Sequence, residues 1–94
     1  MDFPREIPPE QSLITYPSDF PIKVMGPNVD GFAAAMAHVA RAFDEAFDEL
    51  TMEHRPSKAG NYLGLTLTVR VTSREQLDEL YRTLTTHPMV KVVL

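Results

Sequence analysis

The part of the chain with the clearest potential for chemistry is a short polar segment, residues 55–62, with the sequence RPSKAGNY. It combines two cations with small and turn-forming residues: Arg55, Ser57, Lys58, Gly60 and Asn61. One hypothesis is an anion-binding or enzymatic site, in which backbone N–H groups and the two cations hold a phosphate or carboxylate metabolite. The other is a hairpin loop with solvated cations, and loops of this composition favour that interpretation.

Several other kinds of catalytic and metal-binding arrangement are missing from the sequence. It has no cysteine, which removes thiol catalysis, disulfides and cysteine-based metal sites. The histidines at positions 38, 54 and 87 lack metal-ligand spacing, and no HExxH motif occurs. The acids of residues 44–49 are interpreted as a solvated helix end and not as a paired-carboxylate site. We therefore expect a protein that is not an enzyme and that uses no cofactor and no metal.

Size and charge narrow the function further. A chain of 94 residues forms one domain with a modest core, so a ligand should bind on a face, in a loop or between subunits. The net charge of −4 argues against a nucleic-acid partner, because proteins that bind the phosphate backbone usually carry a basic surface. The chain has no apolar run of roughly 18 residues and no signal-peptide pattern at its N-terminus. These features predict a cytoplasmic protein without a membrane partner.

The chain divides into an arm and a domain. Residues 1–17 are rich in proline, which predicts an extended, flexible arm, so the folded domain is assigned to residues 18–94. The domain begins with a strand over residues 20–26, FPIKVMG, in which apolar and polar side chains alternate. In that strand, Lys23 and Met25 should lie on the face opposite the buried side chains.

A helix is predicted next, because apolar residues recur every three or four positions from Phe32 to Phe47. Asn28 or Asp30 is the expected N-cap. The remaining elements are a strand over 50–55 with Leu50, Met52 and His54 on one face, a strand over 61–72, a helix opened by a capping box of Ser73 and Gln76, and a strand over 89–94.

This order, β-α-β-β-α-β, predicts the fold class. Two right-handed crossovers of this kind interleave into an α+β, ferredoxin-like βαββαβ sandwich. Such a sandwich has a four-stranded antiparallel sheet with two helices on one face. Its first and third strands are central, its second and fourth strands are edges, and the other face of the sheet is open.

The open face is the second candidate for function. It should carry these side chains: Lys23, Met25, Tyr62, Thr66, Thr68, Arg70, Lys91 and Val93. RNA-binding domains of this fold stack bases on aromatic residues in the central strands. In this chain, Tyr62 is the one aromatic residue expected on the face, and it lies at the start of its strand. RNA binding is therefore kept as an alternative that the sequence does not favour.

Three motifs together resemble a known family. The segments FPIKVMG, RPSKAGNY and the ending VKVVL resemble the YbeD-like family of small bacterial proteins, over residues from about 16 to 94. The resemblance implies a ferredoxin-like fold similar to the ACT regulatory domains and a bacterial cytoplasmic setting. It implies no established activity, and the family assigns no catalytic residue.

Two functions are therefore in competition. The first is a non-catalytic regulatory or adaptor module similar to ACT domains, which binds a small molecule or another protein. Its sheet edge or face would form either a homodimer or a complex with another protein. The second is the anion site of residues 55–62. The candidate binding residues are Lys23, Met25, Arg55, Ser57, Lys58, Gly60, Asn61, Tyr62, Thr66 and Thr68.

Overall fold

Two long strands form the centre of the sheet. In this computed structural model, which describes residues 15–94, β1 (Ser18–Pro27) and β3 (Tyr62–Val71) pair antiparallel over their whole length. The short strands β2 (Glu53–Pro56) and β4 (Val92–Val93) lie at the two edges, in the order β2-β3-β1-β4. The predicted central and edge positions are confirmed. The predicted arm, residues 1–17, lies outside the described residues except for its last three.

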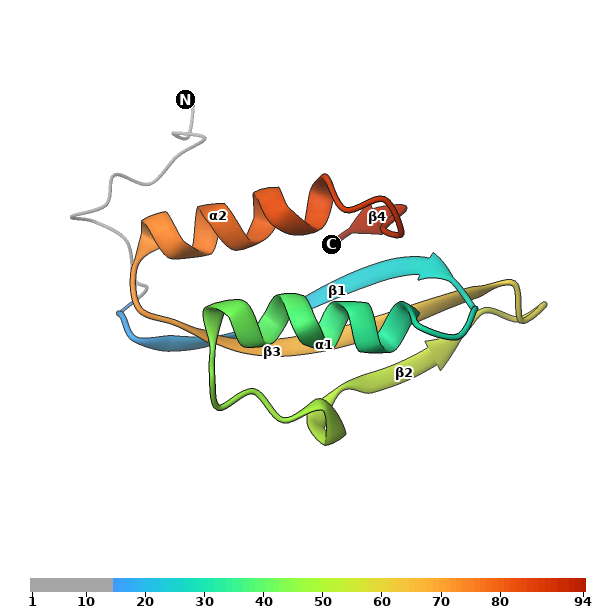
Figure 1. Ribbon diagram of the computed structural model, residues 1–94, viewed down its shortest axis with the longest axis horizontal. Helices are drawn as coiled ribbons and strands as arrows, with labels where there is room; N and C mark the ends of the chain where they lie inside the picture. The colour runs from blue at the N-terminus through green and yellow to red at the C-terminus, as the bar shows by residue number, and fades with distance from the viewer. Residues whose placement is uncertain (1–14) are drawn as a thin grey trace, which may run out of the picture.

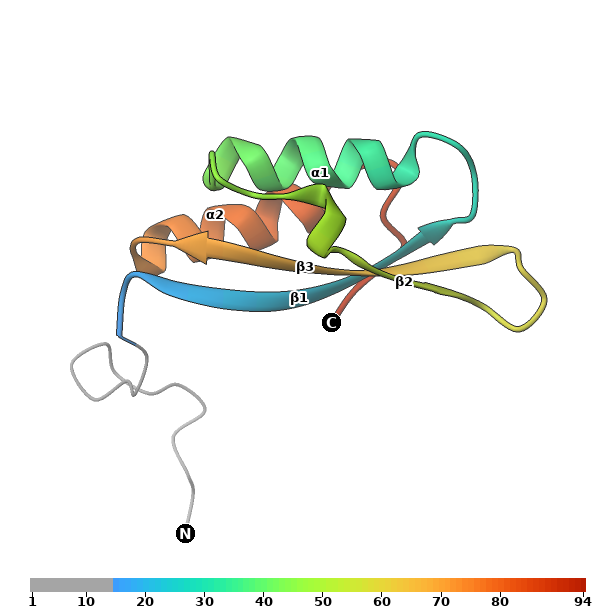
Figure 2. The same cartoon turned by 90° about the horizontal axis from the view of Figure 1, so that it is seen from below.

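Two helices cover one face of this sheet. Helices α1 (Phe32–Phe43) and α2 (Arg74–Thr85) lie on the same side, and Figure 2 shows both of them above the strands. The order of elements along the chain, seen in Figure 1, is the predicted β-α-β-β-α-β. The α+β, ferredoxin-like fold is therefore confirmed. Neither α1 nor α2, nor the short helical turn between α1 and β2, is long and apolar enough to span a membrane.

The core lies between the helices and the sheet. Side chains alternate along β1 and β3. Every second residue is buried in β3 and over residues 22–26 of β1, as predicted for a strand with one covered face. The strands contribute Ile22, Val24, Leu63, Leu65, Leu67, Val69 and Val71, and the helices contribute Phe32, Met36, Ala37, Val39, Ala40, Leu80 and Leu84. No polar or charged residue among residues 15–94 is buried.

Gly26 allows α1 to pack closely on β1. A Cβ atom at this position would lie 2.5 Å from the Phe32 ring and 2.4 Å from the Met89 carbonyl oxygen.

The predicted N-cap of α1 was wrong: the position before α1 is Gly31, at φ 93°, and it provides no side-chain cap. Asn28 instead donates from its side chain to the Gly60 carbonyl, which joins the β1–α1 loop to the β2–β3 hairpin.

The predicted strand over residues 50–55 was wrong in its first half. Residues Glu49–Thr51 form a 3₁₀ turn, η2, because the Asp48 carboxylate accepts a hydrogen bond from the Leu50 N–H at 2.9 Å. Leu50 is consequently 88% exposed, whereas Met52 is buried. The hydrogen bond of Asp48 therefore stabilises a turn where the spacing of apolar residues predicted a strand.

The C-terminal half holds one confirmed detail and one correction. Ser73 caps α2 as predicted, with its hydroxyl accepting from the Gln76 N–H at 3.1 Å. The predicted strand over residues 89–94 is shorter, because β4 contains only Val92 and Val93. Residues 87–90 form a turn, in which the His87 ring accepts from the Met89 N–H.

Candidate functional site

The open face is organised in rows that run across the four strands. The register places Glu53, Thr66 and Lys23 in one row, which the Lys23–Leu94 backbone pair extends to Leu94. The next row contains Arg55, Gly64, Met25 and Val92. The predicted position of Val93 on this face was wrong, and Lys91 lies outside β4. Val93 packs partly against the core, and the register brings Val92 to the open face in its place.

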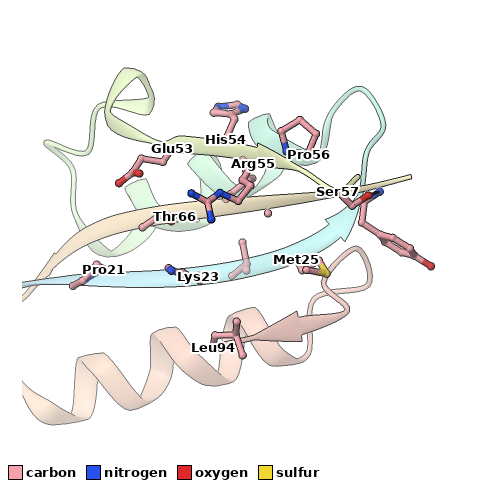
Figure 3. A pocket seen from close by; sticks show the side chains of 14 residues that line it. Pro21, Lys23, Met25, Glu53, His54, Arg55, Pro56, Ser57, Thr66 and Leu94 are labelled. Atoms are coloured by element: carbon pink, nitrogen blue, oxygen red, sulfur yellow. Dashed lines mark hydrogen bonds between the residues drawn. The ribbon is translucent and has the colours of Figure 1, made fainter. Parts of the chain in front are cut away.

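These two rows surround an open depression of about 570 Å³. Figure 3 shows it from close by, with side chains from β1, β2 and the C-terminal residue around it. Gly64 lies in its middle, between Arg55 and Met25 across the strands and between Tyr62 and Thr66 along β3. Because glycine has no side chain, this position leaves the floor of the depression empty.

Two cationic side chains, Lys23 and Arg55, line the depression without an ion-pair partner among the described residues. Within residues 15–94, the side chains of Lys23 and Arg55 form no ion pair, and no hydrogen bond is recorded for them. Farther along the same face, Arg70 is paired with Asp19 at 3.5 Å. Glu53 supplies the one acidic side chain in the lining. The α-carboxylate of Leu94, the last residue of the chain, lies beside Lys23, so the lining holds two cations and two carboxylates. Neither cation forms an ion pair with them.

Apolar side chains form the other part of this surface. Met25 is 39% exposed, Val92 44%, Tyr62 46% and Leu94 73%. Single exposed apolar residues are normal on a protein surface, but a group of them around one depression is typical of a binding site. The surface can therefore hold a molecule with both an apolar part and an anionic part.

Residues 57–62 are largely occupied in building their own loop. The Ser57 hydroxyl accepts from the Tyr62 N–H, and the backbone joins Ser57 N–H to the Tyr62 carbonyl and Gly60 N–H to the Ser57 carbonyl. Gly60 has φ 80°, which favours glycine. Three N–H groups that an anion nest would need are thus already bonded. The anion site of this loop stays a prediction, with fewer free donors than the sequence suggested.

Both edges of the sheet are poorly suited to pairing with another strand. In β1, Lys23 directs its N–H and carbonyl toward Leu94, so by alternation Pro21 faces the same side, beyond the end of β4. Pro21 has no N–H to offer there. On the opposite edge, β2 is short, fully exposed and ends at Pro56. Prolines and short, charged strands are the usual means of blocking edge pairing.

The structure brings together six of the ten predicted binding residues. Lys23, Met25, Arg55, Ser57, Tyr62 and Thr66 line the depression, whereas Lys58, Gly60, Asn61 and Thr68 do not. Tyr62 and Lys23 are not neighbours, because Tyr62 pairs with Pro27, four residues along β1. The sequence analysis did not single out Gly64, whose importance depends on the register. It missed Glu53 and Leu94 because the edge strands were misplaced.

Comparisons with known proteins place the chain among bacterial relatives. A family model described as "Protein of unknown function (DUF493)" matches residues 11–94. A UPF0250 protein of Leptothrix cholodnii is 64% identical over 96% of this chain and 99% of its own length. One of Bordetella parapertussis is 65% identical over the same shares, and one of Janthinobacterium is 61% identical over 95% and 98%.

Proposed function

The chain belongs to the DUF493 family, and we propose that it is a non-catalytic regulatory or adaptor module that recognises its partner with the open face of its sheet. The resemblance to ACT domains suggested such a role, and a cytoplasmic setting belongs to the same proposal. The observation that supports it best is the depression on this face, where unpaired cations and exposed apolar side chains surround an empty floor.

The polar groups of the described residues suit binding better than catalysis. Catalytic groups commonly lie in desolvated sites, where their protonation is adjusted by burial and neighbouring charges. Within residues 15–94, no polar or charged residue is buried, and no group of three or more histidine or acidic residues is placed to hold a metal. A surface of this kind is suited to recognition.

The open face of the sheet is better suited than its edges to be the contact surface. A homodimer or a complex with another protein could form through either one. Pro21 and the short strand β2 disfavour the addition of a strand at the edges. A partner that packs on the face would cover Met25, Tyr62 and Leu94, which are exposed in the isolated chain.

The test is recovery of partners from the native cell with tagged full-length protein and matched variants. Tyr62→Ala and Met25→Ala alter the open face, and Asp78→Ala alters an exposed position on α2. We expect the two open-face variants to lose the partners that the wild type and Asp78→Ala retain. Recovery that is equal in all four proteins would contradict the proposal. A strict monomer by sedimentation that recovers no partner would do the same.

A further inference from the structure

We propose that the depression on the open face is a binding site for an organic anion, a carboxylate or phosphate monoester joined to an apolar group. Arg55, Lys23 and Thr66 would hold the anionic group over Gly64, and the apolar group would lie toward Met25 and Leu94. This inference rests on the proposed function, because it uses the same face and adds the chemistry of the ligand.

The register sets the spacing of the two cations. Arg55 pairs with Gly64 on one side of β3, and Lys23 pairs with Thr66 on the other side. Their backbones are therefore separated by two strand spacings, about 10 Å, with an offset of two residues. Both side chains are long enough to extend over β3 from opposite sides. Figure 3 shows the Arg55 guanidinium and the Lys23 ammonium group on either side of Thr66.

The groups around the floor have capacity for new hydrogen bonds. An arginine guanidinium can bind a carboxylate or phosphate with two parallel hydrogen bonds, and lysine adds a mobile point charge. Neither cation has an ion-pair partner within residues 15–94, and the hydroxyl of Thr66 makes no hydrogen bond to those residues. An anion placed between them would gain contacts without breaking an existing ion pair.

The backbone conformation at Gly64 does not require glycine, so it does not explain the empty floor. Gly64 does not have a positive φ, and a Cβ atom there would lie 3.4 Å from the Arg55 carbonyl oxygen, an ordinary contact. A larger residue could therefore occupy this strand position. With glycine there, the depression measures about 570 Å³, which is within the usual range of small-molecule sites.

The charge and shape of the site favour this ligand over a nucleic acid. Glu53 lies in the same row as Lys23, on the other side of Thr66, and it would repel a long polyanion. The exposed aromatic residue of the face, Tyr62, lies at the end of β3. A single anionic group can bind between Arg55 and Lys23, while its apolar part covers Met25 and Leu94.

The test uses a matched series of small probes with ¹⁵N-labelled full-length protein. Hexanoate and hexyl phosphate carry the anion and the chain, hexylammonium reverses the charge, and hexanol removes it. We expect saturable shifts in the amide signals of Gly64, Thr66 and Met25 with both anions and not with hexylammonium or hexanol. Absence of shifts with the anions, or equal shifts with hexanol, would overturn the inference.

Charge-removing variants show where the probe binds. We expect Arg55→Gln and Lys23→Gln each to weaken hexanoate binding about two- to fivefold, the usual effect of an exposed charge contact. Glu53→Gln should strengthen it about twofold, because it removes a repulsion. Lys58→Gln, which removes a cation from the adjacent hairpin loop, should leave the affinity unchanged. Loss of binding in Lys58→Gln alone would place the anion on the loop and overturn this site.

The two proposals fail in different ways. If no anionic probe binds but Tyr62→Ala and Met25→Ala still lose cellular partners, the open face is functional and the ligand class is wrong. If the probes bind at Gly64 but the same variants retain every partner, the anion site stands and the proposed adaptor role is wrong.

Discussion

Two glycines lie on opposite faces of the sheet, and their surroundings assign them different roles. Gly26 on β1 faces the helices, where a Cβ atom would overlap the Phe32 ring and the Met89 carbonyl oxygen. Gly64 on β3 faces the open side, where a Cβ atom has room. We infer that Gly26 serves packing and that Gly64 serves the depression.

Gly26→Ala tests the packing role. The added methyl group meets the rigid backbone at Met89 as well as the Phe32 side chain, so the neighbours cannot all move away. We expect the free energy of unfolding to fall by about 2 kcal/mol, as is common for overpacked cores. Denaturant unfolding followed by circular dichroism measures the loss. A variant as stable as the wild type would show that α1 can shift on the sheet without cost.

Gly64→Val tests the opposite role. Valine favours strands, and glycine in a strand interior is unfavourable, so stability should be unchanged or should rise by up to about 1 kcal/mol. The same side chain fills the floor of the depression, so the amide shifts caused by hexanoate should disappear. Gly64→Ala serves as the smaller control. Full hexanoate binding in the stable valine variant would separate Gly64 from the site.

At the scale of the elements, the acidic side chain of Asp44 connects the end of α1 to strand β3. The segment after α1 was interpreted as a solvated helix end. The Asp44 carboxylate instead accepts from the Ala46 N–H and from the Arg70 N–H, each at 3.1 Å. The second bond satisfies a donor of β3 beyond the end of β2, so Asp44 fastens the end of α1 to the sheet.

Asp44→Ala should therefore destabilise the protein more than a neighbouring change. Loss of two hydrogen bonds to partly exposed donors is expected to lower the free energy of unfolding by about 1–2 kcal/mol. Glu45→Ala is the matched control, because Glu45 is exposed and no hydrogen bond or ion pair is recorded for it within residues 15–94. Chemical denaturation compares the two variants. Equal stability would mean that water replaces the carboxylate without cost.

The sequence predicted the long elements well and the short ones poorly, for a physical reason. The alternation in β3 spans ten residues and the apolar stripe of α1 spans three turns, so each pattern is repeated enough to be specific. Strands β2 and β4 contain four and two residues, and side-chain bonds to the backbone by Asp48 and His87 decide where the turns beside them lie. The sequence predicted six residues that line the depression, but it missed Glu53 and Leu94, whose positions depend on those edge strands.

At the scale of the whole molecule, the sheet offers one open face and two interrupted edges. Strand β4 pairs with only a short part of β1, so the segment of β1 before Lys23 has no strand beside it on that side within residues 15–94. An uncovered edge of this kind can add a strand from another molecule. Pro21 lies within that segment, with its nitrogen on the exposed side.

Pro21→Val tests whether this proline keeps contacts on the face and away from the edge. Valine restores an N–H group on the unpaired side of β1 and favours a strand, so the edge becomes able to pair with a second copy. We expect concentration-dependent association in sedimentation velocity beyond that of the wild type. The control is Thr68→Val, because Thr68 pairs directly with Pro21 and places the same side chain on the same face without adding a donor to the edge. Equal association of the two variants would trace it to apolar surface, and unchanged sedimentation of Pro21→Val would show that the edge needs no such protection.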